Sequence, residues 1–116
     1  MSQPLVTDQQ RAQLLAVGEA RAAGRPIDPL PVVRLFTPDA HAVWLLAALD
    51  PADGDTAWGL IDLGIGMPAL GTVKLSDLAG IVGPQQRPVL RDLYFHPVRP
   101  LSGYVRMAQL DGSIPD

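Results

Sequence analysis

The amino-acid sequence predicts one α+β domain over residues 1–116, in which an N-terminal helix, a short helix and a C-terminal helix pack on an antiparallel meander of three to five strands. Helix start and stop signals stand near both ends of the chain, and strand-like apolar runs lie between them. Only short turns separate consecutive runs. Because a parallel pair would need a crossover of about a dozen residues, antiparallel pairing is predicted.

The first helix is expected over residues 7–24. Thr7 and Gln10 form a capping box at its start, and Gly24 is the residue that helices favour just past their end. Leucines and alanines recur at helical spacing between these signals. The three prolines in "RPIDPLP" cannot continue a helix, so this segment is predicted to be an extended connector.

The middle of the chain is strand-like, with turns at "TPDA", "PADGD" and "GIGMP". The second run is apolar on both faces, as in a central strand that is covered on both sides. Ser76 is expected to be the N-cap of a short helix that Gly83 and Pro84 end. Strands are expected over residues 32–36, 41–50, 56–64, 71–75 and 89–95, and helices over 77–82 and 100–110. The ends, 1–6 and 111–116, are expected to be flexible.

The composition limits the function classes. The chain has no cysteine, which excludes disulfides, thiolate metal sites and thiol nucleophiles and fits a reducing compartment. No secretory signal is apparent, and the longest apolar run, Ala42–Leu49, is far too short to span a membrane, so a cytoplasmic location without membrane contact is expected. A net charge of −3 with one lysine disfavours direct nucleic-acid binding. The high apolar content, 47%, is compatible with a homodimer.

The glycines in "LIDLGIGMPALG" resemble the start of a phosphate-binding loop. Such a loop must lead into a helix whose amides face the anion. Here Gly64-x-Gly66 leads to Met67, Pro68 and a strand-like run. The segment is therefore interpreted as a turn between strands, and no cofactor is expected.

Four polar residues at predicted strand ends form the hypothesis of an enzyme or metal site: Asp39, His41, Asp62 and His96. If they met at one rim of the sheet, they would suit a small hydrolase or a divalent cation. Asp62 has other possible environments, namely solvent, the backbone amides of the following turn, or an arginine. Because no ligand spacing such as H-x-x-x-H is present, no metal site is assigned, and solvated turn residues are the favoured interpretation.

The C-terminal third contains arginines and tyrosines, the residue types enriched at anchor positions of protein interfaces. A partner-binding surface is therefore predicted around Arg87, Arg91, Tyr94, Arg99, Tyr104 and Arg106. The alternative is a set of solvated guanidinium groups, some of them paired with Asp92 or Asp62. Trp44 and Trp58 are interpreted as core residues that stack across adjacent strands.

Several blocks resemble domain-of-unknown-function family 2958 in order over about residues 8–105: Leu35–Pro38, Trp44–Leu46, Leu49–Pro51 and Asp62–Gly66. The chain departs from the family at Ala42 and Val43, where members tend to have a small residue and then threonine. The resemblance brings no catalytic residue set. It implies a non-catalytic accessory protein of plasmids, phages or integrative elements, which binds a host or transfer-machinery macromolecule, here an unknown protein partner. Mimicry of DNA would need a denser negative charge than −3.

Overall fold

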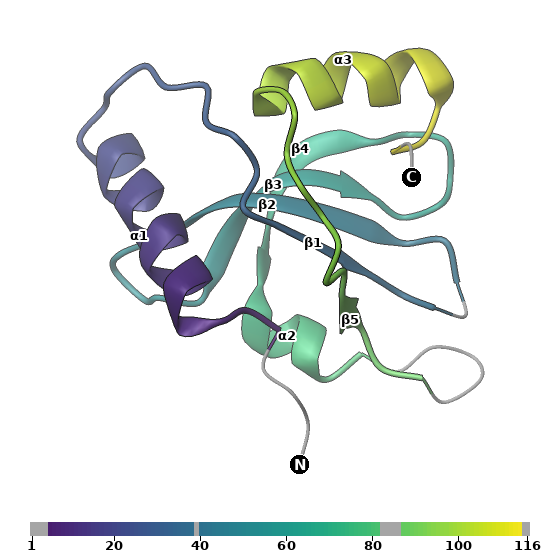
Figure 1. The fold of residues 1–116 in the computed structure, drawn as a ribbon, viewed down its shortest axis with the longest axis horizontal. Coiled ribbons are helices and arrows are strands. Elements are labelled where there is room, and N and C mark those ends of the chain that lie inside the picture. The colour runs from purple at the N-terminus through teal and green to yellow at the C-terminus, as the bar shows by residue number, and fades with distance from the viewer. Residues whose placement is uncertain (1–4, 39, 82–86, 115–116) are drawn as a thin grey trace.

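The computed structural model describes residues 5–38, 40–81 and 87–114 and contains, within them, three helices and five strands (Figure 1). The helices are α1 (Asp8–Ala22), α2 (Leu75–Ala79) and α3 (Leu101–Asp111). The strands are β1 (Val33–Phe36), β2 (Val43–Leu49), β3 (Thr56–Asp62), β4 (Ala69–Lys74) and β5 (Leu90–Arg91). The predicted α+β class is confirmed. No helix in this described part of the chain is both long enough and apolar enough to cross a membrane.

All strands belong to one antiparallel sheet in the order β4-β3-β2-β1-β5. The first four form the predicted meander, and β5 returns to the free side of β1, where Arg91 lies opposite Leu35. The expected last strand, residues 89–95, is shorter than predicted. The chain turns away at Asp92, because its carboxylate accepts a hydrogen bond from the Tyr94 amide (2.9 Å) and so favours a turn over further pairing.

The sheet is covered on both faces. α1 and α2 pack on one face, where the core includes Leu14, Leu35, Trp44, Leu46 and Leu78. α3 packs on the other face, where the core includes Leu45, Leu60, Leu101, Tyr104 and Ala108. The central strand β2 contributes to both, as predicted from its continuous apolar run.

The interpretation that the two tryptophans stack on each other is wrong. Trp44 lies opposite Ile61 and Trp58 lies opposite Ala48. Because alternate residues of a strand point to opposite faces, Trp44 enters the α1 core, whereas Trp58 packs against the α3 core.

The N-terminal helix has the predicted cap. Gln10 N donates to Thr7 Oγ1 (3.0 Å), and Thr7 N donates to Gln10 Oε1 (2.9 Å). The prediction for Ser76 is wrong, since α2 begins at Leu75. Instead, the Ser76 amide and hydroxyl both donate to Asp55, from the turn before β3, at 2.9 and 2.5 Å. The helix also ends earlier than expected, at Ala79 with Gly80 as its C-cap, rather than at Gly83 and Pro84, which lie outside the described residues.

The two ends of the described chain are partly packed. Val6 is buried in the α1 core, and Ile114 is buried beside α3. Residues 1–4 and 115–116, the outermost parts of the segments expected to be flexible, lie outside the described residues.

Candidate functional site

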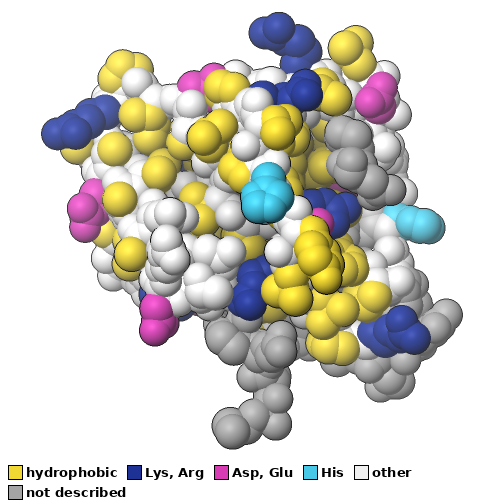
Figure 2. Space-filling view, viewed as in Figure 1, with side chains coloured by type: hydrophobic (Ala, Val, Ile, Leu, Met, Phe, Trp, Pro, Cys, Tyr) yellow, Lys and Arg dark blue, Asp and Glu magenta, His cyan; other side chains and the backbone are white. Residues whose placement is uncertain are grey.

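The segment of residues 92–100, here called the crossing segment, joins β5 to α3 and runs across the sheet (Figure 1). Three of its apolar side chains point outward: Leu93 is 68% exposed, Tyr94 87% and Val98 73%. Figure 2 shows hydrophobic side chains gathered over this part of the surface, with basic and acidic groups beside them. Single exposed apolar residues are ordinary, but a cluster of them on one short segment indicates an interaction surface.

The crossing segment is held at both ends, although it is neither helix nor strand. At its start, the Asp92 amide donates to the Arg34 carbonyl (2.9 Å), and Arg34 Nη1 contacts Asp92 Oδ2 at 3.3 Å. Near its end, the Val98 amide donates to the Tyr104 hydroxyl (3.0 Å). Pro97 and Pro100 further restrict its backbone. The exposed side chains are thus presented on a fixed scaffold, which lowers the entropy lost when a partner binds.

A hollow of about 320 Å³ opens beside the crossing segment, here called the Arg99 hollow. Its polar and aromatic lining includes Arg34, Asp92, Tyr94, His96, Arg99 and Tyr104. The Tyr104 ring is buried and lies 6.4 Å from the Phe95 ring, centroid to centroid. α3 therefore supplies a fixed aromatic wall, and the crossing segment and β1 supply the basic groups.

The residues of the predicted interface are brought together in part. Tyr94, Arg99 and Tyr104 line the Arg99 hollow, although buried Tyr104 supports the surface from within. Arg91, on β5, lines a neighbouring hollow next to the start of α1. Arg87 and Arg106 are exposed and do not line the Arg99 hollow. Arg34, which the sequence reading did not select, lies in a strand and becomes relevant only because β5 pairs with β1.

The hypothetical Asp–His cluster divides between two places. His41 and Asp62 line one hollow of about 380 Å³, whereas His96 lines the Arg99 hollow. Asp39 lies outside the described residues. Among the residues that the structure describes, no three His, Asp or Glu side chains are grouped so that they could hold a metal ion.

Asp62 is engaged by the backbone. It is buried, with 3% of its surface exposed, and its two oxygens accept from the amides of Gly64 (2.8 Å) and Ile114 (3.0 Å). The hydrogen bond from the Gly64 amide agrees with one of the environments predicted for this carboxylate, the backbone amides of the following turn. The turn itself contains Gly64 and Gly66 at φ of 81° and 78°, and it leads into strand β4, which confirms that it is not a phosphate loop.

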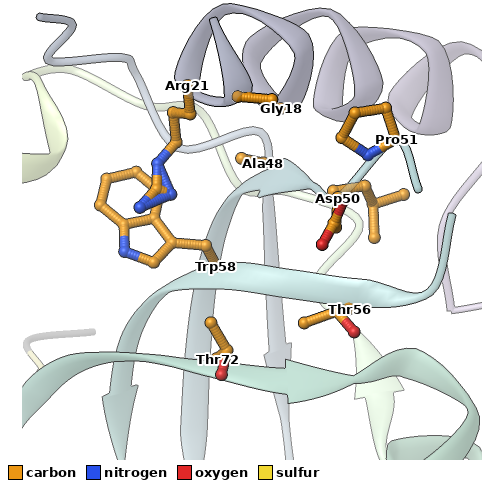
Figure 3. A pocket seen from close by; sticks show the side chains of 10 residues that line it. Gly18, Arg21, Ala48, Asp50, Pro51, Thr56, Trp58 and Thr72 are labelled. Atoms are coloured by element: carbon orange, nitrogen blue, oxygen red, sulfur yellow. The ribbon is translucent and has the colours of Figure 1, made fainter. Parts of the chain in front are cut away.

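Another hollow, of about 250 Å³, lies between the end of α1 and strands β3 and β4 (Figure 3). The Arg21 guanidinium lies over the Trp58 ring, 3.7 Å from its centroid, with Thr56 and Thr72 on the neighbouring strand positions. The sequence gives no signal for this stack, because Arg21 and Trp58 are far apart along the chain. Arg21 already faces the ring's negative π surface, so this cation is partly satisfied within the fold.

The fold and this surface define a small α+β domain with a hydrogen-bonded, partly apolar surface segment. The chain belongs to the family described as "Protein of unknown function (DUF2958)", whose model matches residues 5–115. This membership agrees with the resemblance seen in the sequence blocks. No curated protein and no solved structure matches the chain.

Proposed function

We propose that this protein acts by binding another protein, without catalytic turnover, and that the crossing segment with the Arg99 hollow is its contact surface. The observation that carries the proposal is the exposure of Leu93, Tyr94 and Val98 on a segment that hydrogen bonds and prolines hold in place. Exposed apolar anchors next to arginine are typical of interface hot spots.

The chemistry of the described side chains supports binding rather than catalysis. Both histidines are exposed, and among the described residues no hydrogen bond joins either of them to a carboxylate or a hydroxyl. A nucleophile or general base is normally held by such a bond to an orienting group. Asp62, the most buried acid of the described chain, is already occupied by two amides.

The family resemblance extends the proposal to the biological setting. We propose that the partner is a cytoplasmic protein of the host or of the transfer machinery of a mobile genetic element. Self-association through the same apolar residues stays a prediction, to be distinguished by the experiment below.

The test is site-specific photocrosslinking in cells that naturally carry the protein. A photoreactive phenylalanine analogue replaces Tyr94 in one variant and Gln109, exposed on α3, in a matched control. We expect a discrete adduct from position 94 and none from position 109, and mass spectrometry of the adduct separates a second copy of this chain from another protein. The proposal is overturned if both positions give the same adducts or position 94 gives none.

A second measurement uses Tyr94→Ala. Because the side chain is 87% exposed, its removal should leave the melting temperature unchanged. Capture of the crosslinked partner by the purified variant should weaken about tenfold, as for an interface anchor. Equal capture by the variant and the wild-type protein would show that Tyr94 is not part of the contact surface.

A further inference from the structure

Arg99 has an unusual set of contacts for a cation at the wall of a hollow. Its Nη1 donates to the thioether sulfur of Met107, and its guanidinium carbon lies 5.6 Å from the centroid of the Tyr104 ring. Its Nε is buried and has no hydrogen-bond partner among the described residues. The side chain as a whole is half-buried and lines the Arg99 hollow.

These contacts leave the charge of Arg99 largely uncompensated. A guanidinium has five N–H donors, and a thioether is only a weak acceptor. A buried donor without an acceptor destabilises the fold, and partly buried cations are normally paired with an anion. Arg34 on the same wall differs from Arg99 in that its Nη1 contacts a carboxylate, Asp92 Oδ2, at 3.3 Å. The described lining therefore holds two guanidinium groups and one carboxylate, and that carboxylate is already shared with Arg34.

We infer that the Arg99 hollow is a binding site for a carboxylate, supplied by an acidic side chain or the C-terminus of the protein partner. The inference rests on the proposed function and names the chemistry that the surface recognises. A carboxylate matches the planar donor fork of arginine and satisfies Nε together with a terminal nitrogen. Exposed Tyr94 and Val98 line the hollow with apolar surface, so the recognised segment has an acidic group flanked by apolar residues.

A polypeptide carboxylate fits the surface better than a nucleic-acid phosphate. Binding to nucleic acid depends on several basic contacts along a backbone, whereas this hollow has one uncompensated arginine and the whole chain carries −3. The apolar rim also favours a polypeptide, because a phosphodiester backbone has nothing to pack against it.

The experiment is an NMR titration of the full chain that follows the arginine Nε–H cross-peaks. The probes are N-acetylglutamate amide and its neutral isostere N-acetylglutamine amide, with inorganic phosphate as a third arm. Arg99→Lys identifies the Arg99 cross-peak by its absence. We expect the glutamate probe to shift this cross-peak saturably, whereas the glutamine probe should leave it unchanged.

Matched variants then test whether Arg99 is the binding group. Binding of the probe is measured from the shifts of the backbone amide cross-peaks of residues that line the hollow. Arg99→Gln should weaken binding of the glutamate probe about tenfold or more. Arg106→Gln, at an exposed position of α3 that does not line the hollow, should not. The inference is overturned if the wild-type protein shows no saturable shift, if the glutamine probe binds equally, or if phosphate binds about tenfold more tightly than the carboxylate.

The two proposals fail separately. If position 94 gives an adduct but the glutamate probe does not shift the Arg99 cross-peak, the proposed contact surface is supported and the proposed carboxylate site is overturned. If the glutamate probe shifts the Arg99 cross-peak but position 94 gives no adduct, the proposed carboxylate site is supported and the proposed protein-binding function is overturned.

Discussion

Several aspartates of this chain act as acceptors for segments that lie far from them in sequence. Asp28 accepts from the amide (3.0 Å) and the hydroxyl of Ser102, at the start of α3, and Asp55 accepts from Ser76, at the start of α2. Asp62 accepts from Ile114, near the end of the described chain. A carboxylate set among apolar residues is therefore a poor sign of catalysis here, because the fold uses such groups to satisfy exposed or buried amides.

Asp62→Ala tests this structural use. The change leaves the amides of Gly64 and Ile114 without their hydrogen-bond acceptor. We therefore expect the free energy of unfolding to fall by about 3 kcal/mol. Asp111→Ala, at an exposed position of α3, is the control and should change it by less than about 0.5 kcal/mol. Urea unfolding followed by circular dichroism measures both. If Asp62→Ala is as stable as the control, the carboxylate is held in place for another purpose.

Asp53 makes stability depend on pH in acid. The Thr56 hydroxyl, then the amides of Thr56 and Asp55, hold the pKa of Asp53 down to about 2. The folded pKa is below the ordinary value of 3.8, so the ionised form stabilises the fold. This contribution is complete above about pH 4 and is lost as the pH falls toward about 2.

The measurement is the melting temperature of the wild-type protein and of Asp53→Asn over this pH range. The difference between the two should be largest above about pH 4 and should shrink toward about pH 2. A difference that is constant with pH would show that ionisation of Asp53 has no part in stability.

At the scale of single residues, the sequence shows which residue types are present for binding, but it does not predict which side chains contact one another. Tyr94 and Arg99 could be selected because tyrosine and arginine are enriched at interfaces, and both line the Arg99 hollow. That Tyr104 turns inward and Arg21 covers Trp58 depends on how α1 and α3 dock on the sheet. No local pattern encodes these contacts, since their partners are brought together only by the fold.

At the scale of elements, the closest contact is the crossing of α1 over β2. A Cβ atom added at Gly18 would lie 1.6 Å from the Leu49 carbonyl oxygen, so only glycine allows this approach. Gly18→Ala should therefore lower the free energy of unfolding by about 3 kcal/mol or more, since helix and strand must move apart. Chemical denaturation provides the measurement.

Gly103→Ala is a matched control, because it makes the same change in another helix. Its added Cβ would meet Cδ, Cγ and Cβ of Arg99 at 3.1, 3.2 and 3.4 Å, contacts that a shift of a few tenths of an ångström relieves. Alanine also favours the helix by about 1 kcal/mol over glycine. We expect the unfolding free energy to stay within about 1 kcal/mol of wild type. Equal effects of the two changes would mean that the crossing of α1 and β2 adjusts without strain.

The elements with local signals were the ones that the sequence predicted well. The capping box of α1 and the short turns between β1 and β4 lie within a few residues of the elements they define. The start of α2 was missed because its cap, Asp55, stands 21 residues earlier in the chain. β5 was predicted too long, since the turn in which the Asp92 carboxylate accepts from the Tyr94 amide interrupts the apolar run.

At the scale of the molecule, the C-terminal part is fastened to the N-terminal part at several points. β5 pairs with β1, Ser102 donates to Asp28, and the Leu101 amide donates to the Pro29 carbonyl (2.8 Å). The shared strand β2 lies between the core under α1 and the core under α3. The crossing segment, the proposed contact surface, is thus part of the same structure that holds the sheet together, which predicts a single cooperative unit.

The two tryptophans allow this cooperativity to be measured, because one lies on each face of the sheet. Trp44→Phe leaves Trp58 as reporter of the α3 core and of the Arg21 end of α1, and Trp58→Phe leaves Trp44 as reporter of the α1 core. In each variant, we expect the fluorescence transition in urea to coincide with the circular dichroism transition of that same variant, since a two-state domain loses both cores together. The comparison within one variant removes the effect of the substitution on stability. If the Trp58 transition came at lower urea than the loss of secondary structure, the elements that cover Trp58, namely α3 and the Arg21 end of α1, would separate from the sheet before the rest of the domain unfolds.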